Sequence, residues 1–321
     1  MISAIIQARM TSTRLPGKVL MPLDGQPALK RMIERVRSAK LLDDVIVATT
    51  VNDTDNPIIE LCDSMGVKYF RGSEDDVVGR VLETAKHWGV STIVELTGDC
   101  PLIDPAHIDF LVARHVDALI TTNIDISGNI IGERTFPRGY DIRIFETESL
   151  VRAYKEIDNP IDRQHVGTWM YLNPYGRANY TRLNYTAQTD EERRPDIEVT
   201  LDTQEDYELL DWIFKVGREY QLELTCGQVV SLIDTYPDVY KKVAVVERKS
   251  YEDDINAWYA ANPRKETAII SAQDESNAEF VPISELPEEP PTPKKERKPR
   301  TPKKPATKKP AKKRAAKKVT K

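Results

Sequence analysis

Three cations lie close together directly after the first apolar run of the chain. They are Arg9, Arg14 and Lys18, and the loop that carries them also contains hydroxyl side chains and a Pro16-Gly17 turn. Cationic side chains and exposed backbone N–H groups attract polyanions, and the polyanion that suits such a loop is a nucleoside triphosphate. A solvated cationic turn is the simpler interpretation, but a loop at the end of a first strand favours a ligand site.

The loop matches neither of the two common phosphate-binding motifs. The Walker pattern requires Gly-x-x-x-x-Gly-Lys-Ser/Thr, whereas Ser12 stands at its first glycine position and Val19 follows the lysine. The dinucleotide fingerprint Gly-x-Gly-x-x-Gly is absent because the loop has a single glycine. A different kind of nucleotide loop is therefore expected.

Two aspartates are candidates for binding a metal ion. Asp99 and Asp202 each follow an apolar strand pattern, and Mg²⁺ usually takes one or two carboxylates together with phosphate oxygens and water. Either residue alone could instead cap a helix, since helical stretches follow both within a few residues. Together with the cationic loop, the pair favours a Mg²⁺ site.

Strand and helix patterns alternate in the first half of the chain. Apolar runs and periodicity predict strands at 2–8, 45–48, 67–70 and 92–97, and helices at 27–39, 56–65, about 75–88 and about 105–115. Such alternation predicts an α/β fold in three layers (αβα) around a largely parallel sheet. Thr49 and Asp99 fall just past strands, so both should lie with the loop at the ligand edge of the sheet.

The second half is less regular. Residues 118–145 suggest a strand, a turn at 127–129 (Ser-Gly-Asn) and a returning strand at 140–145. We also expect strands near 178–186 and 197–201, and helices at about 146–156, 161–172, 204–219 and 225–233. This gives a catalytic domain over 1–262, within which 118–186 would bind the acceptor and possibly form a dimer. Residues 263–321 are rich in Lys, Pro and Ala and predict a disordered tail.

Charge is distributed unevenly along the chain. The net charge is −5, and residues 293–321 carry 12 Lys, 3 Arg and 1 Glu, a net of +14, so the remaining residues carry −19. The basic tail could bind nucleic acid or another anionic surface, or simply be solvated. Cys62, Cys100 and Cys226 are widely spaced and predict reduced thiols without a disulfide framework or zinc site, and the four histidines show no metal-ligand spacing. No apolar run approaches a membrane span, and we expect a cytoplasmic protein.

Six strings, in order along about the first two-thirds of the chain, resemble the cytidylyltransferases that activate acidic sugars, such as the CMP-KDO and CMP-acylneuraminate synthetases. The similarity is greatest to the branch of the spore coat polysaccharide biosynthesis protein F. The strings are the loop 5–18, Val47-Ala48-Thr49-Thr50, 70–77 (Phe-Arg-Gly-Ser-Glu-Asp-Asp-Val), 97–105 (Thr-Gly-Asp-Cys-Pro-Leu-Ile-Asp-Pro), and the pair Phe136-Pro137-x-Gly139-x-Asp141 and Leu201-Asp202-Thr203-x-x-Asp206.

The resemblance implies a fold of the nucleotide-diphospho-sugar transferase type and a Mg²⁺-dependent transfer of CMP from CTP to a sugar, with release of pyrophosphate. It implies that Asp99 and Asp202 hold the metal, and that the catalytic residues are Arg9, Lys18 and Asp99. It implies a homodimer. The nucleotide would be bound by Ala8, Arg9, Arg14, Lys18, Thr49, Arg71 and Ser73, and the acceptor by Arg138, Asp141, Arg143 and His165.

The acceptor half departs from the family pattern. Arg138 and Arg143 stand where the family typically has acidic residues, so either could contact a sugar carboxylate, or both could belong to a surface strand of alternating charge. Two other functions are weighed: a non-enzymatic module that binds nucleic acid or an anionic surface through its tail, and a glycosyltransferase. The second usually needs an Asp-x-Asp metal motif after a strand, for which Asp125 is too isolated. The sequence leaves open which sugar, and which nucleotide, is used.

Overall fold

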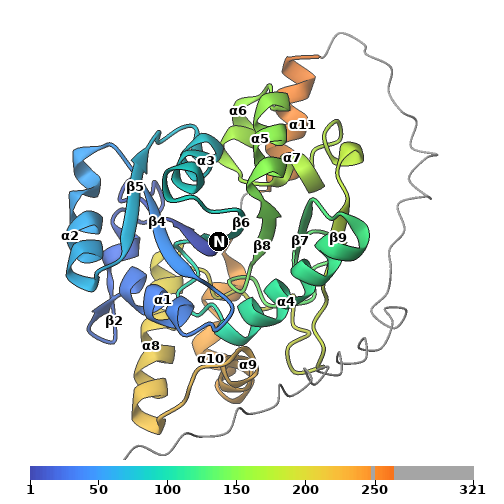
Figure 1. The fold of residues 1–321 in the computed structure, drawn as a ribbon. Coiled ribbons are helices and arrows are strands. Elements are labelled where there is room, and N and C mark those ends of the chain that lie inside the picture. Colours follow the sequence, from blue (N-terminus) through green and yellow to red (C-terminus); the bar gives the residue numbers. More distant parts are fainter. Residues whose placement is uncertain (247–249, 264–321) are drawn as a thin grey trace, which may run out of the picture. The chain divides into compact units, whose positions relative to one another are not determined.

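A seven-stranded sheet forms the centre of the computed structural model, which describes residues 1–246 and 250–263. Its strand order is β5-β4-β1-β6-β8-β7-β9 (Figure 1). The strands are β1 (Ile2–Gln7), β4 (Asp44–Thr50), β5 (Lys68–Gly72), β6 (Thr92–Thr97), β7 (Ile126–Gly128), β8 (Arg143–Glu146) and β9 (Arg182–Asn184). A separate antiparallel pair, β2 (Pro22–Leu23) and β3 (Gln26–Pro27), lies between β1 and the first helix in the sequence.

Six of these strands share one direction. β1 pairs in parallel with β4 and β6, and β4 with β5, while β8 runs antiparallel to both β6 and β7, and β7 pairs in parallel with β9. The largely parallel sheet predicted from the sequence is therefore confirmed. Its parallel part presents the carboxyl ends of β1, β4 and β6 at one edge, where open α/β folds bind ligands.

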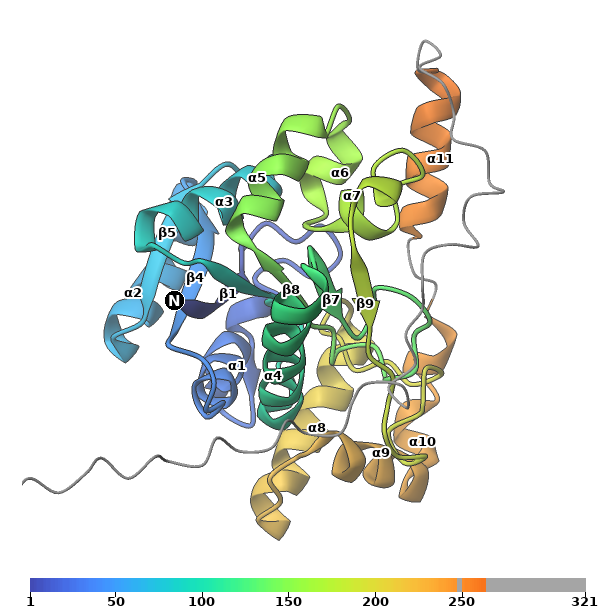
Figure 2. The same cartoon turned by 45° about the vertical axis from the view of Figure 1, so that its right-hand side comes forward.

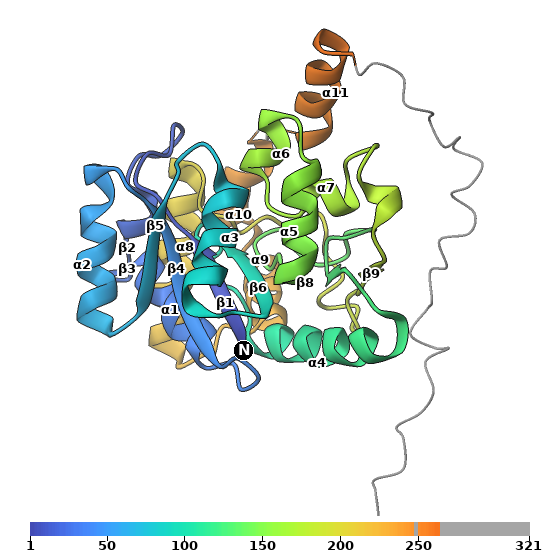
Figure 3. The ribbon, with the colours of Figure 1, turned by 45° about the horizontal axis from the view of Figure 1, so that its top comes forward.

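Helices cover both faces of the sheet. α3 (Val77–Trp88) and α5 (Thr147–Glu156) lie on one side, and α1 (Ala28–Arg37) and α4 (Pro105–Thr122) on the other, as Figures 2 and 3 show. α2 (Asn56–Met65) packs beside β5 at the outer edge. Buried apolar side chains of α3 and α5 join those of β1, β4, β6 and β8 in one core. Apolar residues recur at every second position on the strands and about every 3.6 positions on the helices, so each element turns one apolar face to this core. The three-layer αβα fold is confirmed.

Some boundaries in the second half differ from those predicted. α4 continues to Thr122, so the strand expected from about 118 shortens to β7. The predicted helix 161–172 is two short helices, α6 (Pro160–Gln164) and α7 (Thr168–Tyr171), because Gly167 between them has a left-handed φ of 85°. Of the strand predicted at 197–201, the structure has only a single bridge, from Glu198 to Arg138.

The last part of the described chain forms a second core. α8 (Gln204–Tyr220) and α9 (Cys226–Thr235) each begin with a capping box, and their apolar faces pack with residues 197–201. α10 (Pro237–Tyr240) follows, and α11 (Tyr251–Ala261) contacts α6. Single-turn 3-10 helices are η1 (Lys18–Leu20), η2 (Asp53–Asp55), η3 (Arg177–Asn179) and η4 (Val243–Val245). Within the described residues, no helix is long and apolar enough to cross a membrane. Apart from residue 263, the predicted basic tail lies outside the described part.

Candidate active site

The cationic loop leaves the carboxyl end of β1 and folds back on itself. Gly17 adopts a φ of 73°, which only glycine adopts readily, and its N–H donates to the carbonyl of Met10 at 2.8 Å. The N–H of Leu15 donates to the Ser12 hydroxyl at 3.4 Å, so this hydroxyl holds the turn. The start of the loop is fixed by Asp55, which accepts from the N–H of Met10 at 2.9 Å. These contacts direct Lys18, at the start of η1, back across the end of the sheet.

Lys18 lies between the two candidate metal-binding aspartates. Its Nζ donates to Asp99 Oδ2 at 3.2 Å and to Asp202 Oδ1 at 2.7 Å, although these residues come from three distant parts of the sequence. The three side chains are only partly exposed, at 12%, 25% and 13% respectively. The structure thus brings together the cation and the carboxylate pair that the sequence placed at one edge of the sheet.

Close backbone packing positions both aspartates. A Cβ on Gly98 would lie 2.5 Å from the carbonyl oxygen of Gln7, so only glycine lets the end of β6 come this close to β1. The N–H of Gly98 donates to the same carbonyl at 2.8 Å. On the other side, the N–H of Leu201 donates to the Asp99 carbonyl at 2.8 Å, which holds Asp202 beside Asp99. Asp202 itself precedes the capping box of α8.

Electrostatics keep these groups charged. Burial raises the pKa of Asp99, but the Lys18 charge and hydrogen bonds from Thr97 and Lys18 outweigh burial and hold that pKa below its usual value. Burial lowers the pKa of Lys18, but the two aspartates more than compensate and raise it. The site therefore contains a carboxylate and an ammonium ion at neutral pH.

Two arginines flank this cluster. Arg14 lies 2.9 Å from the same Asp202 oxygen that Lys18 contacts, and its side chain is 40% exposed. Arg9 lies 3.4 Å from Glu74, is 41% exposed, and is the least tightly held of the three loop cations. Glu74 also accepts hydrogen bonds from Thr11 and Asn52. An arginine can grip a phosphate with two parallel N–H donors, whereas lysine acts as a point charge.

The other residues expected to bind nucleotide surround the loop, but their side chains bond mainly to protein. Thr49 is buried and donates to Asp55 at 2.9 Å. Arg71 donates to the carbonyls of Thr50 and Asn52 at 2.8 Å each. The Ser73 hydroxyl accepts from the N–H of Asp76, and Ala8 is buried with its N–H bonded to β4. These side chains shape the wall of the site, and their role in binding nucleotide stays a prediction.

The aspartate pair suits a divalent cation. Two carboxylate oxygens from different segments already converge on one positive centre, the Lys18 ammonium, which marks the place where a metal ion would neutralise the same pair. Hard oxygen ligands of this kind fit Mg²⁺ better than a softer metal. The donor set therefore fits Mg²⁺, with phosphate oxygens and water left to complete the octahedron.

The four residues expected to bind the acceptor fall in two environments. Asp141 forms a two-pronged ion pair with Arg134, and the Arg143 Nε lies 2.7 Å from Glu95, which is completely buried. Arg138 is more open, at 47% exposed and 3.8 Å from Glu198.

His165 is also exposed, and its ring packs edge-on against Tyr251 of α11 at 5.6 Å. Arg138 and His165 therefore offer the open side chains of the expected acceptor set.

A profile of the cytidylyltransferase family matches residues 3–229, which include the loop, both aspartates and the expected acceptor residues. The match spans well over half of the chain. The chain belongs to the cytidylyltransferase family. As a cytidylyltransferase, it is an enzyme of the nucleotidyltransferase class.

Similar proteins agree with this assignment. A cytidylyltransferase from Leptospira borgpetersenii superimposes with a TM-score of 0.67 and 31% identity, covering 78% of this chain and 99% of that one. The spore coat polysaccharide biosynthesis protein SpsF of Bacillus subtilis is 30% identical over 244 residues, covering 73% of this chain and 94% of that protein. A 3-deoxy-manno-octulosonate cytidylyltransferase of Geobacter sulfurreducens is 40% identical over 114 residues, covering 35% of this chain and 44% of that enzyme.

Three acidic residues of this cytidylyltransferase were not singled out from its sequence. Asp55 and Glu74 organise the loop by accepting hydrogen bonds from Met10 and Thr11, from which they are 45 and 63 residues distant in the sequence. Contacts at such separations cannot be read from the spacing of residues along the chain. Glu95 had a visible signal, because a carboxylate within the apolar run of β6 must find a buried partner. That partner is Arg143, which explains an arginine at a position where the family pattern led us to expect an acid.

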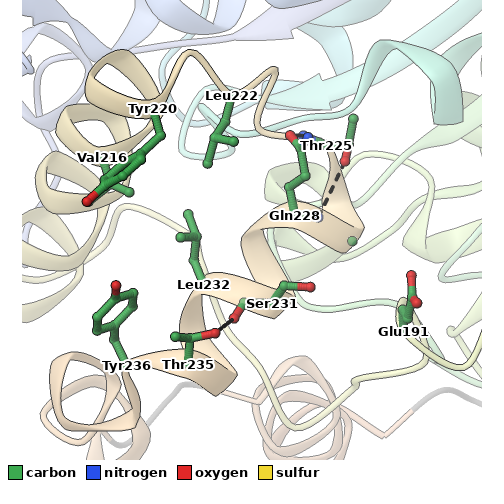
Figure 4. Close-up of a pocket in the computed structure, with 11 residues that line it drawn as sticks. Glu191, Val216, Tyr220, Leu222, Thr225, Gln228, Ser231, Leu232, Thr235 and Tyr236 are labelled. Atoms are coloured by element: carbon green, nitrogen blue, oxygen red, sulfur yellow. Dashed lines mark hydrogen bonds between the residues drawn. The ribbon is translucent and has the colours of Figure 1, made fainter.

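A hollow of about 540 Å³ lies elsewhere, between α8 and α9 (Figure 4). Its wall is largely apolar and includes Val216, Leu222 and Leu232, with Glu191 as its one carboxylate and no lysine or arginine. A triphosphate needs cations, so this hollow is not the nucleotide site of the cytidylyltransferase.

Proposed function

We propose that this enzyme transfers CMP from CTP to a hydroxyl group of an acidic sugar and releases pyrophosphate. The observation that carries the proposal is the meeting of Lys18, Asp99 and Asp202 at the carboxyl edge of the sheet, with Arg14 bound to the same carboxylate. Cations for a triphosphate and carboxylates for its metal ion are the two requirements of nucleotidyl transfer.

In this proposal the loop cations bind the triphosphate. Lys18 and Arg14 exchange their aspartate partners for phosphate oxygens, and Arg9, whose contact to Glu74 is longer at 3.4 Å, closes on the phosphates from the Glu74 side. Asp99 and Asp202 would hold Mg²⁺, and such an ion would supply charge neutralisation at the phosphates. Catalysis then comes from positioning and charge stabilisation.

The attacking hydroxyl forms a bond to the α-phosphorus as the bond from that phosphorus to the pyrophosphate oxygen breaks. The hydroxyl proton goes to solvent or to the leaving pyrophosphate, since no side chain in the described site stands out as a dedicated base. Accurate placement of the sugar therefore matters more than proton transfer by the protein.

The acceptor would lie beside β7 to β9 and the helices α5 to α7. Arg138 has an exposed guanidinium and is the better candidate to contact a sugar carboxylate, because Arg143 already neutralises buried Glu95. The similarity to an enzyme named for 3-deoxy-manno-octulosonate supports an acidic sugar, and the similarity to SpsF supports a place in polysaccharide biosynthesis. The homodimer and the role of the basic tail stay predictions.

Pyrophosphate release tests the proposal. The full chain is incubated with each of four nucleoside triphosphates, Mg²⁺ and a panel of acidic and neutral sugars. We expect turnover with CTP and an acidic sugar, its loss in Asp99→Asn, and unchanged turnover in the control Asp63→Asn, an exposed residue of α2. Turnover with a neutral sugar that Arg138→Ala leaves unaffected would overturn the acceptor assignment, and activity surviving in Asp99→Asn would overturn the mechanism.

A further inference from the structure

Three residues with good metal-binding side chains converge outside the site described above. They are His107 on α4, Glu192 in the long loop before Ile197, and Cys226 at the start of α9, and one ligand atom from each lies within 4.8 Å of the other two. His107 Nε2 and Glu192 Oε1 are 2.9 Å apart, and the Cys226 side chain is completely buried. None of the three belongs to the cationic loop or to the aspartate pair.

Two buried polar atoms at this cluster have no hydrogen-bond partner among the described residues. One is Nδ1 of His107 and the other is the hydroxyl of Tyr140, a residue with no exposed surface. The rings of these two residues lie 6.0 Å apart.

Leaving such atoms unpaired costs free energy, on the order of 1–3 kcal/mol for each buried group. The ring atom that His107 offers beside Glu192 is Nε2, so an ion bound between these residues would replace their hydrogen bond.

We propose that His107, Glu192 and Cys226 bind a structural Zn²⁺ ion. One thiolate, one imidazole and one carboxylate form a ligand set typical of zinc and unsuited to Mg²⁺. In a tetrahedral site the nitrogen and sulfur ligands lie about 3.5 Å apart, and the ligand atoms here lie within 4.8 Å of one another, so the side chains need to draw together by at most about 1.3 Å. The Tyr140 hydroxyl, or a water that it holds, supplies the fourth ligand, and the thiol proton of Cys226 leaves to solvent on binding.

Such an ion would fasten three segments that carry the active site. The loop that contains Glu192 has no regular secondary structure and leads to Glu198 and then to Asp202. Asp104 already links the other two segments, because it accepts from the N–H groups of Ala106 in α4 and Cys226 in α9. Glu192 of the loop already contacts His107 of α4, and zinc would strengthen these links and so hold the segment that presents Asp202.

Sequence spacing concealed this cluster. His107 and Glu192 are 85 residues apart, and Cys226 is on a third segment, so no short zinc motif exists and the sequence predicted none. Only the fold brings the three residues together, which is why the structure leads to a different inference for Cys226.

Cobalt binding tests the proposal on the full chain. Metal-free protein is titrated with Co²⁺ in excess Mg²⁺, which occupies the aspartate pair, and the absorption spectrum is recorded. We expect one Co²⁺ per chain with a thiolate-to-cobalt charge-transfer band and tetrahedral ligand-field bands. Displacement by Zn²⁺ should remove both and should raise the thermal unfolding midpoint.

The variants separate this site from general thiol effects. Cys226→Ser should abolish the thiolate band and weaken Co²⁺ binding by about a hundredfold or more. Loss of a hydrogen-bonding partner outside the coordination shell can already cost about a hundredfold in metal affinity, and loss of a ligand should cost at least as much. The matched control is Cys62→Ser, another completely buried free thiol, on α2, which should leave the spectrum unchanged. A wild-type spectrum without a thiolate band overturns the proposal even if a variant fails to fold, and so does a band that persists in Cys226→Ser.

Discussion

Replacing Lys18 with methionine should strengthen Mg²⁺ binding in the absence of nucleotide. Methionine keeps the apolar stem of the side chain but removes the ammonium that lies 3.2 Å from Asp99 and 2.7 Å from Asp202. In the wild type a metal ion can use this pair only after the ammonium has left both carboxylates. In Lys18→Met that competition is gone.

The expected size follows from the two hydrogen bonds. Each bond between charged groups contributes about 1.5–3 kcal/mol, and all three side chains are at least three-quarters buried. Taking the lower value for both gives about 3 kcal/mol, and a factor of ten corresponds to about 1.4 kcal/mol. The Mg²⁺ affinity of Lys18→Met without CTP should therefore rise by about a hundredfold. Affinity for CTP should fall, because the same ammonium would bind the triphosphate.

Titration calorimetry with Mg²⁺, and electron spin resonance with Mn²⁺ as a probe, measure this directly without any turnover. Lys30→Met is the matched control, because Lys30 contacts Glu34 of α1 at 3.8 Å and Gln26, away from the aspartate pair. The Mg²⁺ affinity of this variant should equal that of the wild type. If Lys18→Met binds the ion no more than threefold tighter than the wild type while pyrophosphate release disappears, then Asp99 and Asp202 do not hold the metal.

Three further outcomes are expected. Arg143→Met should lower the free energy of unfolding by about 3–5 kcal/mol in denaturant melts, because it leaves buried Glu95 without its charged partner. A double variant that also carries Glu95→Gln should recover most of that loss. If it recovers none, lost packing and not the unpaired charge is responsible. Burial would raise the pKa of Asp55, but its threonine and backbone donors hold it below the usual value. Its stabilising contribution is thus complete above about pH 4 and lost as the pH falls, so acid should destabilise Asp55→Asn less steeply than the wild type. Deleting 264–321 should leave pyrophosphate release nearly unchanged. Deleting 250–321 should lower the melting temperature, because the Tyr251 hydroxyl of α11 donates to Asp162 of α6 and the Tyr259 hydroxyl accepts from Asn159, which caps α6.

The parallel half of the fold could be predicted because its signals are local. Each strand of that half is a short apolar run and each helix has a 3.6-residue stripe, ended in two cases by a glycine, Gly66 and Gly89, in the left-handed region. The antiparallel part was harder. β7 and β9 have three residues each, and their pairing depends on contacts far along the chain, so local pattern could not fix their ends. Likewise nothing in residues 197–201 shows that only one bridge forms.

The site divides in the same way. The order of strands in an α/β fold sends the loop, Asp99 and the end of β4 to one edge, so their meeting could be predicted. The partners of each side chain could not. The pairing of Arg143 with Glu95, and the hydrogen bonds of Arg71 to the carbonyls of Thr50 and Asn52, were not foreseen, and the ligand roles of both arginines stay predictions. The hydrogen-bond and ion-pair partners of a side chain depend on distances of a few ångström in the folded chain, which the spacing of residues in the sequence does not give.

The ion pairs of the cationic loop suggest how the enzyme keeps a highly charged site stable before substrate arrives. Lys18 and Arg14 neutralise Asp202, and Lys18 also neutralises Asp99, so the free state buries no uncompensated charge. In the proposed mechanism the metal ion and the triphosphate would enter together, so that each carboxylate gained a cation, each cation gained a phosphate, and every charge again had a partner. Entry of either one alone leaves a mismatch, because the metal ion displaces an ammonium with no phosphate to receive it. The geometry therefore favours binding of the metal and nucleotide as one complex, and it makes the Lys18→Met variant the chain in which that coupling should disappear.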